Sequence, residues 1–359
     1  MKLFTLGPVE MYPYTRDLLG EQLPYFRTGA FSEVVLECAE RLKRLAGAPA
    51  DAHVYLLTGS GTGAMEAAVA GCFAPDDHLL VIDGGGFGHR FAEICAHHGI
   101  SHEAVRVPFG ETLSPSHLDF NNKNKPLDAV LVNHHETSVG RLYDLDLIAS
   151  FCREKNAYLV VDAISSFLAD PIDFEGQGID ALILSSQKAL ALPPGLSMLI
   201  LSDRLYRRIS ERDIRPFSLY FDLRDAEANA VRGQTPFTPA VGTILALRER
   251  LEHLEAEGGY AAAAAATQAL SDGFRAALQG LPVALPAHPL SAACTPLFFP
   301  RGGAKAVFKT LSEEHDVWLN PNGGELADKL LRVGHLGALT LEDGVFLAGL
   351  LADILTESE

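Results

Sequence analysis

An aspartate and a lysine in the middle of the sequence stand where they could act together in catalysis. Asp162 closes one apolar run, residues 158–162, and Lys188 follows shortly after another, residues 181–185. If both runs are strands of a parallel sheet, their carboxyl ends share one edge and both side chains project into the same crevice. A plain ion pair is one interpretation, although a buried pair is costly without further partners. A ligand between the two groups is the other.

Pyridoxal phosphate is a ligand that would occupy this position. Lys188 would hold its aldehyde carbon as an imine, and Asp162 would face its ring nitrogen. A carboxylate at that place favours the protonated nitrogen, which withdraws electrons from the substrate's α-carbon. The lysine must also be released as a free amine to move the α-proton, so a site that lowers its pKa helps.

A glycine-rich turn supplies a candidate binding site for the phosphate. Residues 58–64 read Thr-Gly-Ser-Gly-Thr-Gly-Ala and lie between a predicted strand and a predicted helix. Glycines let the backbone approach an anion, and the N–H groups of a helix start attract it. Ser60 and Thr62 add hydroxyl donors, and Phe87 could lie flat on the pyridine ring. A tight turn and a core phenylalanine are the plainer interpretations.

The same turn also matches a dinucleotide fingerprint. Gly59-x-Gly61-x-x-Ala64 lies between a strand and a helix, and Asp83 closes the next strand 22 residues past Gly61, since 83 − 61 = 22. These are the features expected of a nicotinamide-binding βαβ unit. A NAD-dependent dehydrogenase is therefore an alternative that the first hundred residues support equally well.

The elements that must position these residues alternate along the chain. Short apolar runs predict strands at residues 53–57, 78–82, 129–133, 158–162, 181–185 and 196–201, and helical spacing predicts helices at 33–46, 63–72, 91–98 and 145–155. Continuous apolar strands separated by helices indicate a mostly parallel sheet that helices cover on both faces. The fold class is therefore α/β.

The pattern changes beyond about residue 240. Long helices are predicted at 241–257 and 261–278, followed by strand-like pieces at 282–285, 295–299, 316–319 and 330–333 and by helices at 305–313 and 340–355. This is typical of a smaller α+β unit. We predict an N-terminal segment over residues 1–20 that borders the active site, a large domain over 21–245 and a small C-terminal domain over 246–359.

Composition excludes several classes of partner. The 359 residues are 48% hydrophobic and carry a formal net charge of −17, which repels nucleic acid and anionic membrane surfaces. No apolar stretch is long enough to span a membrane. Five scattered cysteines without a paired motif indicate reduced thiols, and adjacent histidines such as His97 and His98 do not form a metal-binding pattern. We expect a cytoplasmic protein without a metal.

With these residues and motifs the sequence resembles the class V aminotransferases, a branch of the fold type I pyridoxal phosphate enzymes. The resemblance runs from Leu-Gly-Pro at 6–8 to Arg-Val-Gly-His-Leu-Gly at 332–337. Its most specific parts are Val-Asp-Ala at 161–163, Ser-Ser-Gln-Lys-Ala-Leu at 185–190 and Pro-Pro-Gly at 193–195. The alanine–glyoxylate, serine–glyoxylate and 2-aminoethylphosphonate–pyruvate transaminases are the members it is most similar to.

The resemblance implies a role for each matching position. Lys188 would form the Schiff base and Asp162 would pair with the ring nitrogen. Phe87 would stack on the ring, and Thr137 would hydrogen-bond the phenolic oxygen. Arg332 would grip the substrate carboxylate, for which a planar bidentate fork is suited.

The phosphate contacts that the resemblance implies come from both subunits of a homodimer. Those within one chain are Ser60, Gly61, Thr62 and Gln187. Thr238, in the segment Thr-Pro-Phe-Thr-Pro at 235–239, would reach the cofactor of the other subunit. The active sites would then lie at an isologous interface.

The implied activity is a ping-pong transamination from a small amino donor, such as alanine, serine or 2-aminoethylphosphonate, to glyoxylate or pyruvate. A lyase on the same fold and a catalytically silent binding module are alternatives. Desulfuration is disfavoured because Gln187 and Phe87 stand where desulfurases usually carry histidines. Whether His335, Arg16 or Arg27 contacts the substrate stays open at this stage.

Overall fold

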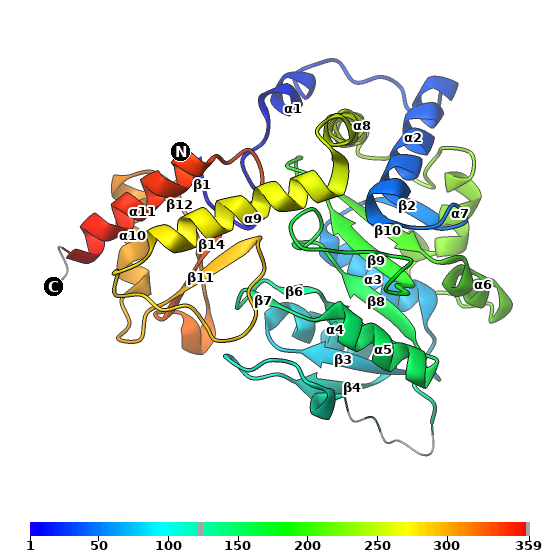
Figure 1. The fold of residues 1–359 in the computed structure, drawn as a ribbon. Helices are drawn as coiled ribbons and strands as arrows, with labels where there is room; N and C mark the ends of the chain where they lie inside the picture. The colour runs from blue at the N-terminus through cyan, green and yellow to red at the C-terminus, as the bar shows by residue number, and fades with distance from the viewer. Residues whose placement is uncertain (119, 121–124, 357–359) are drawn as a thin grey trace.

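The computed structural model describes residues 1–118, 120 and 125–356. The chain forms a large α/β part around a seven-stranded sheet and a smaller C-terminal part around a three-stranded sheet (Figure 1). The small part lies to one side of the large sheet, and the long helix α9 (Gly259–Ala277) runs between the two (Figure 1). The α/β fold expected from the sequence is confirmed.

The large sheet is mostly parallel. Its strands follow the order β2 (His53–Thr58), β10 (Leu196–Leu201), β9 (Ala181–Ser185), β8 (Tyr158–Asp162), β5 (Ala129–Asn133), β3 (His78–Asp83) and β4 (Ser101–Arg106). Only β10 runs antiparallel to its neighbours, β2 and β9. The carboxyl ends of β2, β9, β8, β5 and β3 therefore meet along one edge, together with the start of β10.

Helices cover both faces because alternate residues of each strand are buried on opposite sides. Val130 and Val132 of β5 pack in one core and Leu131 packs in the other. The first face is covered by α2 (Gly29–Ala46), α5 (Leu145–Lys155) and α8 (Val241–Ala256). The second is covered by α3 (Gly61–Cys72), α4 (Gly86–His97), α6 (Asp203–Glu211) and α7 (Leu223–Ala230).

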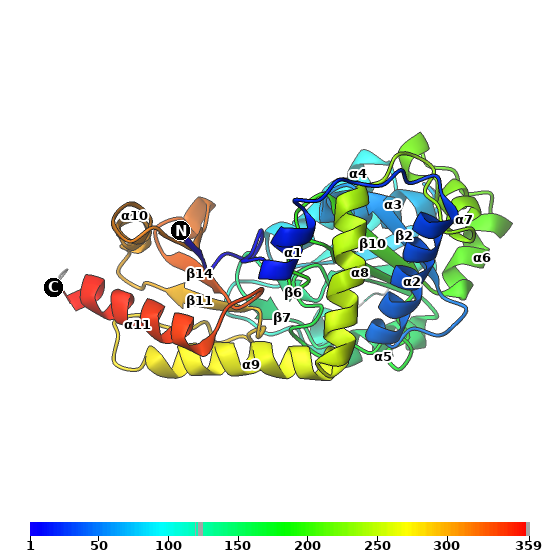
Figure 2. The same cartoon turned by 90° about the horizontal axis from the view of Figure 1, so that it is seen from above.

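The small part has its own core. An antiparallel sheet, in the order β11 (Cys294–Phe298), β14 (Leu330–Gly334), β13 (Asn320–Pro321), packs with α9, α10 (Ala304–Glu314) and α11 (Leu341–Thr356). The N-terminal strand β1 (Lys2–Leu3) pairs in parallel with β12 (Val317–Trp318) of this part. The chain then passes to α1 (Pro13–Leu18), which packs on α8, so residues 1–18 join the two parts (Figure 2).

Minor elements complete the described chain. They are the hairpin strands β6 (His135–Glu136) and β7 (Arg141–Leu142) and the short 3₁₀ helices η1 (Pro115–His117), η2 (Leu219–Phe221) and η3 (Gly324–Leu326). None of the helices in the described ranges is long and apolar enough to cross a membrane. The five cysteines are free and buried, as expected for reduced thiols.

The elements differ from the sequence-based prediction at several places. Strand β4 and helices α1, α6 and α7 were not predicted. The strand expected over residues 282–285 is wrong, because only Ala284 pairs there, in a single bridge to Phe298. The predicted domain boundaries stay a prediction, although β1 shows that the first residues pair with the small part.

Candidate active site

Strand register brings the sequence-predicted residues to one edge of the large sheet. Asp162, the last residue of β8, lies opposite Asn133 of β5. Ser185, the last residue of β9, pairs with Ser197 of β10, and Thr58 at the end of β2 pairs with Leu196. Asp162 therefore lies at the same edge as the loops that carry the glycine-rich turn and Lys188.

Lys188 is partly buried, and its side-chain amine has no ion-pair or hydrogen-bond partner in the part of the chain that the structure describes. Burial lowers its pKa to about 8; the Asp162 carboxylate acts in the opposite direction, and the positive charge of Arg332 lowers the pKa further. The N-terminal segment covers its alkyl stem, since a Cβ on Gly7 would lie 2.7 Å from Lys188 Cδ. The φ of Gly7 is +132°, so both the contact with Lys188 and the backbone conformation disfavour a side chain at this position.

Asp162 is 6% exposed, and the described residues supply a hydrogen bond to only one of its carboxylate oxygens. Oδ1 accepts from the backbone N–H of Ile164 at 2.8 Å. Burial raises the pKa of Asp162 to about 7, against the effects of the Ile164 hydrogen bond and of Lys188. Lys188 and Asp162 interact electrostatically, but they do not lie within 4 Å as an ion pair, so the simple ion-pair interpretation is wrong.

The glycine-rich turn forms the start of helix α3. Ser60 is the N-cap, and its Oγ accepts from Gly63 N at 3.4 Å. In the described chain no acceptor lies within hydrogen-bonding distance of the backbone N–H groups of Gly61 and Thr62. A Cβ on Gly61 would collide with Ile164, two residues after Asp162, so this helix start packs directly beside the aspartate loop. Two unsatisfied N–H groups at a helix N-terminus are suited to bind an anion.

Phe87 lies in the first turn of α4, at the same edge. Its ring is partly buried and belongs to neither core of the large part, so the core-packing interpretation is not supported among the described residues. The buried carboxylate of Glu136 fixes this turn: it accepts from Gly88 N at 2.8 Å and from Phe87 N at 3.3 Å. A carboxylate at a helix N-terminus is stabilising, and here it orients the phenylalanine.

Thr137 is buried in the hairpin that follows β5. Its Oγ1 lies 2.6 Å from Ser165 Oγ, and its carbonyl accepts from Arg332 Nη1 at 2.9 Å. Ser165 belongs to the loop after Asp162, so this hydrogen bond connects the hairpin to that loop. The threonine is thus placed beside both the aspartate loop and the arginine.

Arg332 reaches the candidate site from the small part. It stands in the middle of β14, and its guanidinium donates to Thr137 O and to Pro321 O, each at 2.9 Å. Its Nε is buried without a partner in the described residues. Burial lowers the pKa of Arg332. A desolvated guanidinium that forms no ion pair with any carboxylate of the described residues is suited to bind an anionic ligand group.

The remaining predicted residues differ in their positions. Gln187 follows β9, and its Oε1 accepts from Ser185 Oγ at 2.5 Å. Thr238 is exposed, in a segment that packs beside Thr58, just before the glycine-rich turn. Arg27 donates to Gln234 and to the backbone of that same segment, which gives it a structural role in this chain. Arg16 is exposed on α1.

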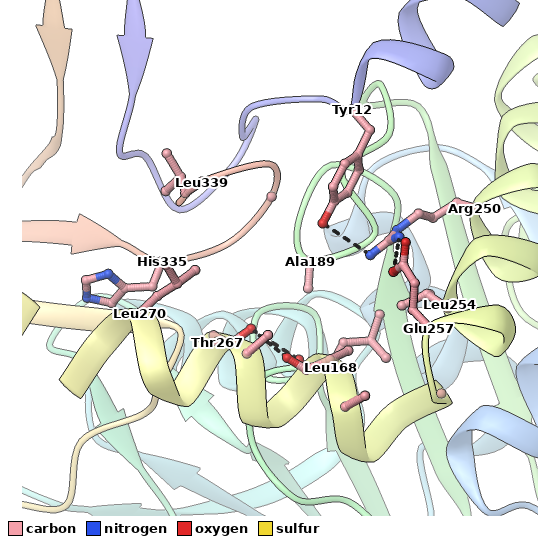
Figure 3. A pocket seen from close by; sticks show the side chains of 15 residues that line it. Tyr12, Leu168, Ala189, Arg250, Leu254, Glu257, Thr267, Leu270, His335 and Leu339 are labelled. Atoms are coloured by element: carbon pink, nitrogen blue, oxygen red, sulfur yellow. Dashed lines mark hydrogen bonds and ion pairs between the residues drawn. The ribbon is translucent and has the colours of Figure 1, made fainter. Parts of the chain in front are cut away.

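His335 lines a different space, a cavity of about 220 Å³ between the two parts (Figure 3). Its Nε2 bonds Thr295 Oγ1 at 2.7 Å, and burial lowers its pKa to about 3. Arg250 lies on the other side of the cavity, beside Tyr12 and Glu257 (Figure 3). None of the predicted cofactor contacts lines this cavity, and with a pKa near 3 the His335 ring is neutral there.

The dinucleotide alternative is contradicted by the topology. A nicotinamide-binding βαβ unit needs the strands before and after the glycine turn to be neighbours. Here β2 and β3 are separated by β10, β9, β8 and β5. The Asp83 carboxylate is also occupied, since Oδ2 lies 2.8 Å from Arg106 and 3.1 Å from His89. The fingerprint residues have the expected spacing along the sequence, but the strands β2 and β3 that flank them do not form a βαβ unit.

Comparison with known families agrees with this geometry. The family model described as "Aminotransferase class-V" matches residues 25–327. The chain belongs to the class V aminotransferase family. It is therefore an aminotransferase, and the family depends on pyridoxal phosphate. The match spans the glycine-rich turn, Asp162 and Lys188, and it ends before Arg332.

Three similar proteins show how broad this family is. A "2-aminoethylphosphonate--pyruvate transaminase" of Burkholderia thailandensis is 36% identical over 76% of this chain and 75% of its own. A protein of a Synechococcus species named "Soluble hydrogenase, small subunit" is 30% identical over 98% of this chain and 92% of its own. The crystal structure of an alanine–glyoxylate aminotransferase from Nostoc has a TM-score of 0.92 at 26% identity, covering 99% and 96% of the two chains. The names differ, so the amino donor does not follow from them.

Sequence reasoning missed three residues of this aminotransferase that support the site. Gly7 packs on the stem of Lys188, Glu136 fixes the turn of Phe87, and Ser165 bonds Thr137. The Leu-Gly-Pro motif pointed to Gly7, because it was part of the resemblance. Glu136 and Ser165 carry no local signal, since their partners lie 48 and 28 residues away in the chain.

Proposed function

We propose that this class V aminotransferase moves an amino group from a small amino donor, such as alanine, serine or 2-aminoethylphosphonate, to a 2-oxo acid such as glyoxylate or pyruvate. The observation that carries the proposal is the group formed by the buried Asp162 and the partly buried Lys188 and Arg332, which share one site and have no ion-pair partner within the described chain. Buried charges without partners are unfavourable unless a ligand neutralises them.

The residues fit pyridoxal phosphate. The unpaired Lys188 amine would bind the aldehyde, and the free oxygen of Asp162 would meet the ring nitrogen. Free N–H groups at Gly61 and Thr62, the Ser60 hydroxyl and Gln187 would hold the phosphate. Phe87 would cover the ring, and Thr137 would bond the phenolic oxygen. When bound, the cofactor supplies an electron sink for the negative charge that forms at the substrate's α-carbon.

The chain's own groups supply proton transfer and orientation. A lysine whose pKa lies near 8 is partly an uncharged amine at neutral pH, so it can accept the α-proton and return it. Asp162, with its pKa near 7, becomes fully ionised when a cation is placed beside it. Arg332 binds the carboxylate that donor and acceptor share or, in an aminophosphonate, the phosphonate.

We further propose a homodimer with active sites at the interface. Beside Thr238, Tyr220 stacks on Phe237 with ring centroids 4.9 Å apart. Neighbouring Phe217 and Leu219 are 96% and 75% exposed, and Tyr25 is 68% exposed. Large exposed apolar side chains mark an interaction surface, and their place beside Thr238 supports its contact with the other subunit's cofactor.

A panel of amino donors tests the function. Each donor is added to the holoenzyme without an oxo acid, and conversion of the bound cofactor to its amine form is followed by absorbance. Glyoxylate or pyruvate should then restore the original spectrum and yield one amino acid per site. Formation of a lyase product, with no amino acid made from the added oxo acid, would contradict transamination.

A further inference from the structure

Two histidine–serine pairs lie next to each other below the candidate site. His134 Nδ1 bonds Ser166 Oγ at 3.1 Å, and His135 Nδ1 bonds Ser165 Oγ at 3.0 Å. All four side chains are buried, His135 with 2% exposure. Among the described residues only the second pair continues to a further side chain, because Ser165 Oγ also lies 2.6 Å from Thr137 Oγ1. The chain of contacts His135–Ser165–Thr137 therefore ends at the hydroxyl proposed to meet the cofactor's phenolic oxygen.

Burial, together with neighbouring positive charge, keeps the His135 ring neutral. Burial lowers its pKa far below the ordinary value, and neighbouring His134, Lys188 and Arg332 act in the same direction. The hydrogen bond with Ser165 opposes this effect but does not outweigh it. A neutral imidazole carries one proton, so one ring nitrogen donates and the other accepts.

The surroundings select the nitrogen that carries the proton. His135 Nε2 is buried and lacks a hydrogen-bond partner in the described residues. A proton there would leave a buried donor unsatisfied, in a region where Lys188 and Arg332 place positive charge. A proton on Nδ1 has an acceptor at once in Ser165 Oγ. We therefore assign the proton to Nδ1.

That assignment favours one direction for each bond in the chain. If Nδ1–H donates to Ser165 Oγ, the serine hydroxyl has two acceptors in the described residues, Thr137 Oγ1 at 2.6 Å and His135 O at 3.5 Å, and it donates to the nearer one, Thr137 Oγ1. The Thr137 hydroxyl can then only donate elsewhere, and its one other acceptor in the described chain is His135 O at a long 3.3 Å. Arg332, which bonds the Thr137 carbonyl, fixes the backbone of the same residue.

We propose that His135 and Ser165 are positioning residues that make the Thr137 hydroxyl an obligatory donor to the cofactor's phenolic oxygen. This inference rests on the proposed function, because it needs pyridoxal phosphate beside Thr137. A donor stabilises the anionic oxygen, so the bound chromophore loses its proton at a lower pH than it would without the relay.

The test is a pH titration of the visible absorption of the purified holoenzyme. Ser165→Ala should raise the midpoint by up to about one pH unit, the scale of one hydrogen bond. Thr137→Val should raise it similarly, and the double variant should add little, because both changes remove the same donor. Ser166→Ala, which removes the matching hydroxyl of the first pair, is the control and should leave the midpoint in place.

A conservative variant at the histidine sharpens the test. His135→Asn keeps an N–H near the position of Nδ1 and should leave the midpoint of the pH titration unchanged, whereas His135→Leu should raise this midpoint. A midpoint that moves with Thr137→Val but not with Ser165→Ala overturns the relay and leaves the proposed function standing. Equal shifts for Ser165→Ala and Ser166→Ala also overturn it, and a colourless protein overturns the proposed function itself.

Discussion

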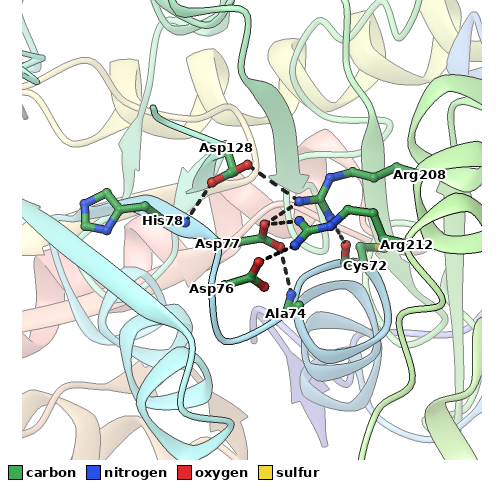
Figure 4. A network of polar contacts seen from close by, with 8 residues as sticks. All are labelled: Cys72, Ala74, Asp76, Asp77, His78, Asp128, Arg208 and Arg212. Atoms are coloured by element: carbon green, nitrogen blue, oxygen red, sulfur yellow. Dashed lines mark hydrogen bonds and ion pairs between the residues drawn. The ribbon is translucent and has the colours of Figure 1, made fainter. Parts of the chain in front are cut away.

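Two regions of this aminotransferase bury charges in opposite ways. At one end of the large sheet Asp77, 2% exposed, accepts from Arg208 at 2.5 Å, from Arg212 and from Ala74 N at 2.8 Å (Figure 4). Arg208 also bonds the Cys72 carbonyl. At the candidate site Lys188, Asp162 and Arg332 form no ion pair within the described chain.

The difference separates structural charges from functional ones. In the Asp77 network the carboxylate pairs with the guanidinium groups of Arg208 and Arg212, and the hydrogen bond to Asp77 raises the pKa of Arg212. In the candidate site burial dominates and moves the pKa values of Asp162 and Lys188 towards neutrality. Perturbed values of this kind are expected where groups are kept for a ligand. Substitutions in the two regions should therefore affect different properties.

The largest effect is expected at Lys188. Lys188→Ala should lower kcat by at least about 1,000-fold, because both the covalent attachment and the proton transfer are lost. Its melting temperature should be unchanged or higher, since an unpaired desolvated amine is removed. Lys43→Ala is the matched control: this buried lysine bonds Ala50 O at 2.9 Å and Glu40, so its loss should reduce stability and spare activity. Turnover by Lys188→Ala at the wild-type rate would contradict the account.

In the Asp77 network we expect the reverse result, in which a substitution lowers stability and leaves the cofactor bound. Asp77→Ala leaves the buried Arg208 guanidinium without its closest carboxylate and should destabilise the fold by about 3 kcal/mol in urea unfolding. Cofactor absorbance should persist. Asp76→Ala, at an exposed carboxylate that pairs with Arg212, should cost less than about 1 kcal/mol. Equal losses at the two positions would remove the contrast between buried and exposed pairs.

A pH-dependent effect is expected at Asp162 in the cofactor-free protein. Its folded pKa of about 7 exceeds the ordinary 3.8, so between these values the folded state binds more protons than the unfolded state. Stability therefore falls as pH rises through this window, by on the order of 4 kcal/mol. The Asp162→Asn variant should not show this fall in stability. The urea concentration at the midpoint of its unfolding should exceed that of the wild type at pH 8 and approach it at pH 4.5. A difference independent of pH would refute the assigned shift.

The smallest effect is expected at Arg332. Arg332→Lys keeps the charge but loses the bidentate fork, so KM for the oxo acid should rise about 10- to 100-fold while kcat changes less. Arg27→Lys serves as control, because Arg27 bonds the 234–236 segment and should leave KM unchanged. Steady-state kinetics with one oxo acid separates the two constants.

Local patterns predicted the parts of the fold that are buried on both faces. Strands β5, β8 and β9 are continuous apolar runs and were placed with the correct bounds. Strand β4, Ser101–Arg106, was missed because it is an edge strand with polar, partly exposed residues. Helix α6 was missed although Ser202, its N-cap, and the buried Leu205 and Ile209 give a helical signal.

The residues of the candidate site also differ in whether local sequence patterns predict them. Lys188 and Asp162 could be found from the sequence because each follows a recognisable strand. Glu136 and Ser165 could not, since their roles depend on contacts between loops that the fold brings together. The dinucleotide alternative was excluded by the strand order and by the ion pairs of Asp83, neither of which spacing along the chain reveals.

Borohydride trapping tests the central claim most directly. The purified protein should be yellow, and reduction should remove the visible band and attach the cofactor irreversibly to one peptide. Mass spectrometry should locate the added mass on Lys188, and Lys188→Ala should show none. A colourless protein that retains no pyridoxal phosphate, or a label on any other lysine, would contradict the account.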